Sequence, residues 1–185
     1  MDALQALLTR RSSPRLSTPA PSEEQLENIF LAALRTADHA LLKPFRFLTL
    51  QGAALNKLGE LFVTAELASG KALAQDQAAK LRAKPMRAPL IVVAIATIRP
   101  HDKVPAIEQE YSAAAAVQCM SLAAYAQGIG AMWRTGSKAY DATVRQGLGV
   151  ESHEKIVGFL YLGTPCGPLK GLVTGQIDDF VKTWE

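Results

Sequence analysis

The chain has 185 residues and a formal net charge of +3, with 49% hydrophobic and 20% charged residues. This size predicts one domain, residues 1–185, and the composition is that of a globular protein rather than a disordered one. The small net charge and the low share of aromatic residues (6%) argue against a nucleic-acid-binding module.

The cysteines and the N-terminal sequence indicate the cellular compartment in which the protein is expected. Cys119 lies in an apolar, Ala-rich run and is expected to be a buried thiol, and Cys166 lies in a Pro/Gly-rich loop. Their spacing is not that of a metal site, so a reduced, cytoplasmic protein is the simplest expectation. The N-terminus lacks a signal-peptide layout. Residues 111–133 carry no charge, but their polar residues and many alanines predict a helix buried in protein rather than a membrane span.

The first third of the chain predicts two helices and a strand. Residues 2–9 form an apolar helix, and Ser22-Glu23-Glu24-Gln25 is a capping box that begins a second one. Pro44 breaks the chain, and residues 45–50 read as a strand that ends at Gly52.

The remainder alternates helices with apolar runs. We expect helices over 54–83 (with a break at 69–70), 105–127 and 141–147, and strands over 90–96 and 156–162, with a short strand or turn at 131–134. The uninterrupted apolar run at 90–96 indicates a strand covered on both faces. Pro105 would lie in the first helical turn, Gly128 would cap the helix C-terminus, and Gly163 and Pro165 would stop the last strand. This order predicts an α+β or three-layer domain.

The tail from Gly171 is polar with scattered apolar residues. These are Ile177, Phe180, Val181 and Trp184. We expect them to pack on another surface, and a partner subunit is one candidate.

Several common chemistries find little support in the sequence. His39, His101 and His153 are not accompanied by a Gly-x-Ser-x-Gly motif, and no pair of histidines has metal-ligand spacing. No phosphate-binding glycine fingerprint follows a strand, and the glycines at 128 and 130 fit a helix cap and a tight turn.

Three polar clusters remain as candidate sites. Arg10-Arg11-Ser12 could hold a phosphate, because arginine forks pair with phosphate oxygens and a hydroxyl completes the cradle; a solvated basic linker is the alternative. Arg35 and His39 could share a helix face if the second helix continues that far, or could simply complement the helix dipole. Trp133-Arg134-Thr135, after an apolar strand, suits a planar ligand with a phosphate; a surface ion pair is the alternative.

At these residues the chain resembles the FMN-dependent nitroreductase family, and most closely its short branch. The resemblance lies in residues 1–12, 38–39, Pro44, 87–90, 103–110, 128–134 and 159–165. These motifs occur in order along nearly the whole chain, and segment 53–84 and the last fifteen residues match poorly. The resemblance implies a three-layer α+β fold, with a mainly antiparallel central sheet flanked by helices. It also implies an obligate homodimer whose two FMN molecules each touch both subunits.

The resemblance also implies residue roles. Arg10, Arg11 and Ser12 would hold the FMN phosphate and ribityl chain, and Trp133, Arg134 and Thr135 would contact the same FMN. Arg35 and His39 would reach it from the other subunit. NAD(P)H would approach near Ala123, Ala124, Tyr125, Ala126, Gln127 and Gly128. No catalytic protein residue is implied, because the flavin carries the chemistry.

The implied activity is a ping-pong reaction. NAD(P)H gives a hydride to FMN N5, and a nitroaromatic, quinone or similar acceptor then takes the electrons. The alternative is a flavin-binding dimer with little reductase turnover.

Two positions depart from the family pattern. Many members have a basic residue two positions after the motif's serine, where this chain has Pro14 followed by Arg15. Either Arg15 or Arg35 is therefore expected to stabilise reduced flavin. Many members also have Gln-Pro-Trp where this chain has Lys43-Pro44-Phe45, which bears on substrate preference.

Overall fold

The computed structural model describes residues 1–169, 171–172 and 174–185. Its centre is a sheet in the order β1-β5-β3-β2, with β4 also paired to β5. The strands are β1 (Leu16–Ser17), β2 (Phe45–Gln51), β3 (Leu90–Thr97), β4 (Gly130–Arg134) and β5 (Glu154–Pro165). All of the strand pairs among the described residues are antiparallel, which confirms the expected sheet type.

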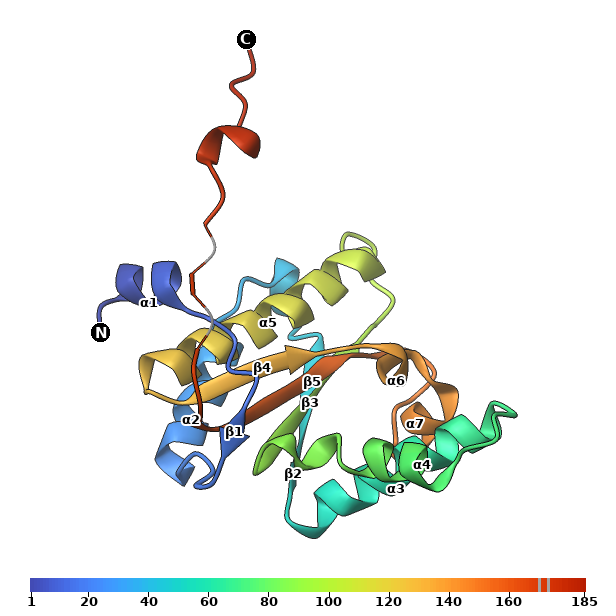
Figure 1. The fold of residues 1–185 in the computed structure, drawn as a ribbon. Coiled ribbons are helices and arrows are strands. Elements are labelled where there is room, and N and C mark those ends of the chain that lie inside the picture. Colours follow the sequence, from blue (N-terminus) through green and yellow to red (C-terminus); the bar gives the residue numbers. More distant parts are fainter. Residues whose placement is uncertain (170, 173) are drawn as a thin grey trace.

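Helices cover both faces of this sheet (Figure 1). Buried residues of α2 (Glu23–Leu34) and α5 (Ala106–Ala126) pack on one face. Those of α3 (Ala53–Ala68), α6 (Ser137–Tyr140) and α7 (Ala142–Gly147) pack on the other. The remaining helices are α1 (Ala3–Thr9), α4 (Gln75–Arg82) and the short turns η1 (His39–Leu41), η2 (Pro85–Arg87) and η3 (Ile177–Asp179). The expected three-layer α+β architecture is therefore confirmed.

Strand β3 is covered by helices on both faces, which explains its uninterrupted apolar run at 90–96. Successive side chains of a strand point to opposite faces. Leu90, Val92 and Ala94 accordingly lie in the core beneath α2 and α5. Ile91, Val93 and Ile95 lie in the core beneath α3. A central strand between two helical layers needs apolar side chains on both of its faces, and therefore at even and at odd positions.

The expected caps form largely as predicted. Ser22 accepts from the Gln25 backbone N–H, and the Gln25 side chain accepts from the Ser22 N–H, so the capping box of α2 is confirmed. Gly128 ends α5 with φ of 76°, a left-handed conformation that glycine adopts without a Cβ penalty. Pro105, however, occupies the N-cap position of α5, one residue before the expected first turn.

Other expectations need correction. Strand β5 is longer than predicted, because its partners β4 and β1 continue the ladder through Gly163 to Pro165. Of the two alternatives expected for residues 131–134, the strand is confirmed, because these residues pair with β5. Cys119 is half-buried, not buried.

The C-terminal tail extends away from the body of the protein (Figure 1). The side chains of Ile177, Phe180, Val181 and Trp184 are open to solvent in the single chain, and Trp184 is 93% exposed. Their packing on a partner subunit stays a prediction. In the part of the chain that the structure describes, no helix is both long enough and apolar enough to cross a membrane.

Candidate functional site

The basic N-terminal motif lies across strand β4. Helix α1 ends at Arg10, whose backbone N–H donates to the Ala6 carbonyl at 3.0 Å. The chain then crosses β4, where the Ser13 N–H donates to the Ala131 carbonyl at 2.9 Å. A Cβ at Gly130 would meet the side chains of Leu16, Ser13 and Pro165. Glycine at 130 therefore lets the N-terminal segment lie directly on the strand.

This crossing builds a pocket of about 310 Å³, which we call the Arg10 pocket. It is lined by Arg10, Ser12, Gln118, Ser121, Ala131, Trp133 and Thr135. Two of the predicted clusters, more than a hundred residues apart in sequence, thus meet at one cavity. The lining carries one guanidinium and several neutral hydroxyl and amide groups, which is a suitable donor set for a phosphate and a hydroxylated chain.

Sequence reasoning did not select two of the polar lining residues. Gln118 and Ser121 stand three positions apart on α5 and therefore share a face. Their polarity within an Ala-rich helix was the available signal. The Ser121 hydroxyl donates to the Val117 carbonyl at 3.0 Å.

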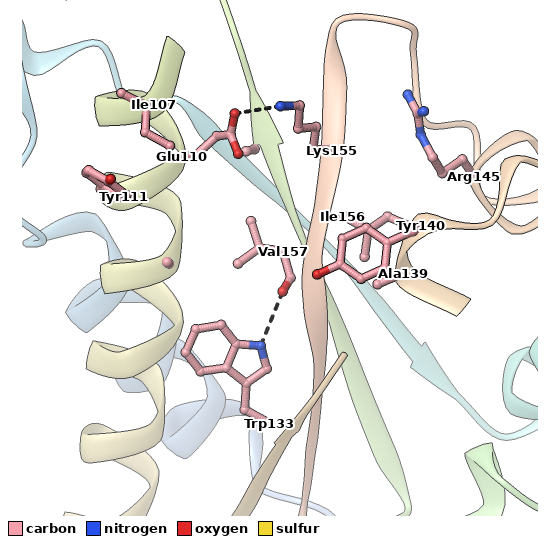
Figure 2. A pocket seen from close by; sticks show the side chains of 12 residues that line it. Ile107, Glu110, Tyr111, Trp133, Ala139, Tyr140, Arg145, Lys155, Ile156 and Val157 are labelled. Carbon is pink, nitrogen blue, oxygen red and sulfur yellow. Dashed lines mark hydrogen bonds and ion pairs between the residues drawn. The ribbon is translucent and has the colours of Figure 1, made fainter. Parts of the chain in front are cut away.

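Trp133 lines the Arg10 pocket and two neighbouring cavities as well. Its indole Nε1 donates to the Val157 carbonyl at 3.3 Å, as Figure 2 shows. A Cβ at Gly158 would collide with the same indole nitrogen, so glycine there allows the ring to lie against β5. The ring is thereby fixed on β5 as a shared wall.

The cavity in Figure 2, about 450 Å³, lies between α5 and β5 and is largely apolar. Tyr111 and Tyr140 stand on opposite sides of it. Its charged residues are already engaged: Lys155 pairs with Glu110 at 2.7 Å, and Arg145 donates to two backbone carbonyls. This cavity offers apolar and aromatic surface rather than charge.

The other neighbouring cavity, about 430 Å³, contains Arg134, and we call it the basic pocket. It is lined by Phe62, Lys84, Arg87, Met132, Trp133, Arg134, Thr135, Gly136, Ser137, Lys138, Phe159 and Tyr161. The Arg134 guanidinium lies 5.4 Å from the centre of the Tyr161 ring, a cation–π distance. Its Nε is buried and has no hydrogen-bond partner among the described residues. A buried donor of this kind is costly unless a ligand satisfies it.

Two arginines of the basic pocket act on the phenol of Tyr161. Burial raises the pKa of its phenol, and the positive charges of Arg134 and Arg87 oppose that rise. Beside it, Lys138 is buried and pairs with Glu66 of α3 at 2.8 Å. Lys138 and Lys71 together lower the pKa of Glu66 to about 2. This ion pair ties α6, and the turn at Gly136, to α3.

The predicted Arg35/His39 cluster is not at these pockets within one chain. Helix α2 ends at Leu34 with Arg35 as its C-cap, so the two residues do not share a helix face as the spacing allowed. His39 instead contacts Glu108 near the start of α5, with Nδ1 and Oε2 2.7 Å apart. Glu108 precedes Gln118 by ten residues, about 15 Å along a helix. Whether this cluster completes a partner's site stays a prediction.

The segment expected near NAD(P)H forms the C-terminal end of α5 and packs against α1 and α2. Ala124 is fully buried, and the Tyr125 hydroxyl donates to Thr9 Oγ1 at 3.1 Å. Gln127 bonds to Asn28 and to the carbonyl of Gln25. Residues 123–128 do not belong to the lining of the Arg10 pocket.

Two further predicted residues complete the picture. Arg11 is half-buried beside Arg10. Arg15 is exposed, and its carbonyl accepts from the Cys166 N–H at 3.2 Å. Arg15 is not among the residues that line the Arg10 pocket or the basic pocket.

Comparisons with known proteins agree with this fold. The chain is 43% identical over 166 residues to the Escherichia coli K12 protein named "Putative NAD(P)H nitroreductase YdjA", covering 89% of each chain. A nitroreductase-like family protein from Bacillus cereus has the same fold, with a TM-score of 0.85 at 20% identity over 100% of this chain and 97% of that one. A Bacteroides fragilis nitroreductase with bound FMN has a TM-score of 0.74 at 21% identity, with 98% of each chain covered. Residues 7–164 match the model of the Nitroreductase family, and the chain therefore belongs to that family.

Proposed function

We propose that this protein is an FMN-dependent NAD(P)H oxidoreductase that reduces nitroaromatic, quinone or similar acceptors. The observation that carries the proposal is the Arg10 pocket, where the basic N-terminal motif and Trp133-Thr135 line one cavity. The name of the Escherichia coli relative and the FMN in the Bacteroides fragilis neighbour support the same activity and cofactor.

The residues present fit a flavin mononucleotide. Arg10 supplies a charge for the phosphate, and the Ser12 hydroxyl supplies a hydrogen bond. Trp133 and Thr135 continue the cavity with an aromatic wall and a hydroxyl, and the buried Arg134 Nε is a donor that still lacks a partner among the described residues. When bound, FMN would supply hydride acceptance from NAD(P)H and electron delivery to the acceptor.

The protein's own contribution is position and charge. The hydrogen bond from Trp133 to Val157 and the absence of a side chain at Gly158 hold the aromatic wall in place. The Lys138–Glu66 pair holds the turn that follows Thr135. Fixed cations beside the flavin would stabilise the negative charge that reduction adds, because fixed dipoles and charges need no reorganisation during reaction.

We also propose that the working unit is a homodimer. Large apolar side chains are exposed on α1 (Leu4, Leu8), on η1 (Leu41), on α5 (Tyr111) and along the tail. Helix α1 packs against α5 through the Tyr125–Thr9 hydrogen bond, and apolar side chains exposed together on neighbouring elements are typical of a subunit interface. Arg35 and His39, which do not line the Arg10 pocket of their own chain, would serve the partner's flavin in such a dimer.

An absorption spectrum of the purified, FMN-reconstituted protein tests the proposal. We expect bound flavin, its bleaching by NADH or NADPH without oxygen, and recovery of colour on adding a nitroaromatic or a quinone. A protein that takes up no FMN would refute the cofactor assignment. Bound flavin that NAD(P)H does not reduce would instead favour the flavin-binding dimer with little turnover. Light scattering on a sizing column measures the dimer in the same sample.

A further inference from the structure

The basic pocket carries more positive charge than its own protein partners neutralise. Four of its lining residues are basic (Lys84, Arg87, Arg134 and Lys138), and none of the described residues that line it is acidic. Of these four, Lys138 is neutralised by Glu66 at 2.8 Å. Lys84, Arg87 and Arg134 make no ion pair with any residue that the structure describes.

The three remaining cations surround an aromatic floor. Phe159 and Tyr161 are buried at the base of the pocket, and Trp133 forms the wall shared with the Arg10 pocket. Arg134 lies over the Tyr161 ring, and the charge of Arg87 also reaches that tyrosine. Lys84 is the N-cap of the η2 turn and Arg87 is its last residue, three positions before β3 begins. The cavity therefore combines flat aromatic surfaces with a positive electrostatic potential that no acidic lining residue offsets.

This combination selects for a particular ligand chemistry. A cavity of about 430 Å³ accommodates one or two aromatic rings rather than a whole dinucleotide. Aromatic walls favour a flat ring, and uncompensated guanidinium and ammonium groups favour an anionic substituent on it. A positive cleft also concentrates anions from solution.

We infer that the basic pocket selects electron acceptors that carry an anionic group, an aromatic carboxylate being the fitting class, with Arg87 and Lys84 as the specificity-determining cations. This inference rests on the proposed function and narrows its acceptor. Arg134, which the family resemblance assigns to the flavin, lines this pocket beside Trp133 and Thr135, the two residues that also line the Arg10 pocket.

The test compares two acceptors that differ in charge alone. FMN-loaded protein reduces 4-nitrobenzoate or its neutral analogue 4-nitrobenzamide with NADH. In each case the nitro group accepts two electrons from NADH and two protons, one from NADH and one from solvent, and yields a nitroso group, water and NAD⁺. We expect a lower KM for the benzoate in the native protein, and we expect added salt to raise that KM while leaving the KM of the amide unchanged.

Substitution of the two cations locates the effect. In Arg87→Gln and Lys84→Gln, the preference for the benzoate should fall by about tenfold, the scale of one charge-assisted hydrogen bond near solvent. Arg87→Lys should keep most of the preference. Arg99→Gln, at an exposed arginine outside the pocket, is the matched control and should keep all of it. Calorimetric titration of the oxidised protein with 4-nitrobenzoate and with 4-nitrobenzamide, without NADH, measures their binding in the absence of turnover. The affinities should show the same pattern as the KM values.

Three results would overturn the inference. An unchanged preference in Arg87→Gln and Lys84→Gln would show that these cations do not contact the acceptor. A weaker affinity for FMN in these variants would assign them to the flavin phosphate. A KM raised for NADPH but not NADH would assign them to the dinucleotide. Bleaching of the flavin by NADH, measured first in each variant, tells these results apart from a failure of the proposed function.

Discussion

The Arg46–Glu154 ion pair provides a quantitative test of how the sheet is held together near the site. Arg46 Nε and Nη2 donate to the two Glu154 carboxylate oxygens at 2.7 and 2.6 Å. Nη2 also donates to the Gly149 carbonyl at 2.9 Å, and the Glu151 N–H donates to Glu154 at 2.9 Å. The Glu154 side chain is 5% exposed and that of Arg46 is 34% exposed. The pair joins β2 to the first residue of β5. Strand β5 also contains Val157, whose carbonyl accepts the hydrogen bond from Trp133.

The size of the effect follows from this geometry. Arg46→Met removes the guanidinium and leaves a buried carboxylate that still accepts from the Glu151 N–H. Loss of one partner of a buried pair costs about 3 kcal/mol, near the lower end of the usual range because Arg46 is partly open to solvent. The pKa of Glu154 gives a similar figure. The hydrogen bonds from Arg46 are the largest cause that lowers it from 4.5 to about 2, with smaller contributions from the Glu151 N–H and the charge of His153. The whole shift, which is not due to Arg46 alone, corresponds to about 3 kcal/mol.

The same pKa sets the pH dependence. Because the folded-state pKa lies below the unfolded value, the pair's stabilisation is fully present above pH 4.5 and is lost as the pH falls towards 2. Native and Arg46→Met curves of unfolding free energy against pH should therefore lie about 3 kcal/mol apart at pH 7, begin to approach each other below pH 4.5 and meet near pH 2.

Urea unfolding followed by circular dichroism measures this difference, at one fixed protein concentration because a dimer's stability depends on it. The double variant Arg46→Met/Glu154→Leu should recover much of the loss, since it removes the uncompensated charge. A pH-independent difference, or one under about 0.5 kcal/mol at pH 7, would refute the reasoning.

Three further predictions concern the site and its supports. Arg10→Ala should weaken FMN binding by about 1.5–3 kcal/mol, measured by flavin titration, and an unchanged affinity would exclude a phosphate contact. Gly158→Ala should destabilise the fold by about 1–3 kcal/mol and shift the fluorescence of Trp133, because the new methyl group would meet the indole; Gly171→Ala, where a Cβ meets nothing, is the control. Ser22→Ala removes the N-cap of α2 and should cost about 1 kcal/mol in urea unfolding, whereas exposed Ser152→Ala should cost almost nothing.

Local signals in the sequence were sufficient for most elements. The capping box at Ser22, the glycine at 128 and the apolar run at 90–96 each act through neighbours a few residues away, and each produced the expected structure. The elements that were missed are short. Strand β1 has two residues, and α6 has four, so neither has a periodicity to detect. The extension of β5 depended on its partners in the sheet.

The candidate site divides in the same way. The sequence alone identified the residue types, since three arginine-containing clusters and the family resemblance pointed to a phosphate-bearing flavin. The tertiary structure decided which clusters meet: Arg10 and Ser12 share a cavity with Trp133 and Thr135, whereas the end of α2 keeps Arg35 and His39 apart from it. It also placed Lys84 and Arg87 in one pocket with Arg134, although no sequence motif links these residues. The physical reason is that propensity and periodicity act over single helical turns and strand pairs, while a binding site is set by long-range packing of strands and loops that sequence distance does not encode.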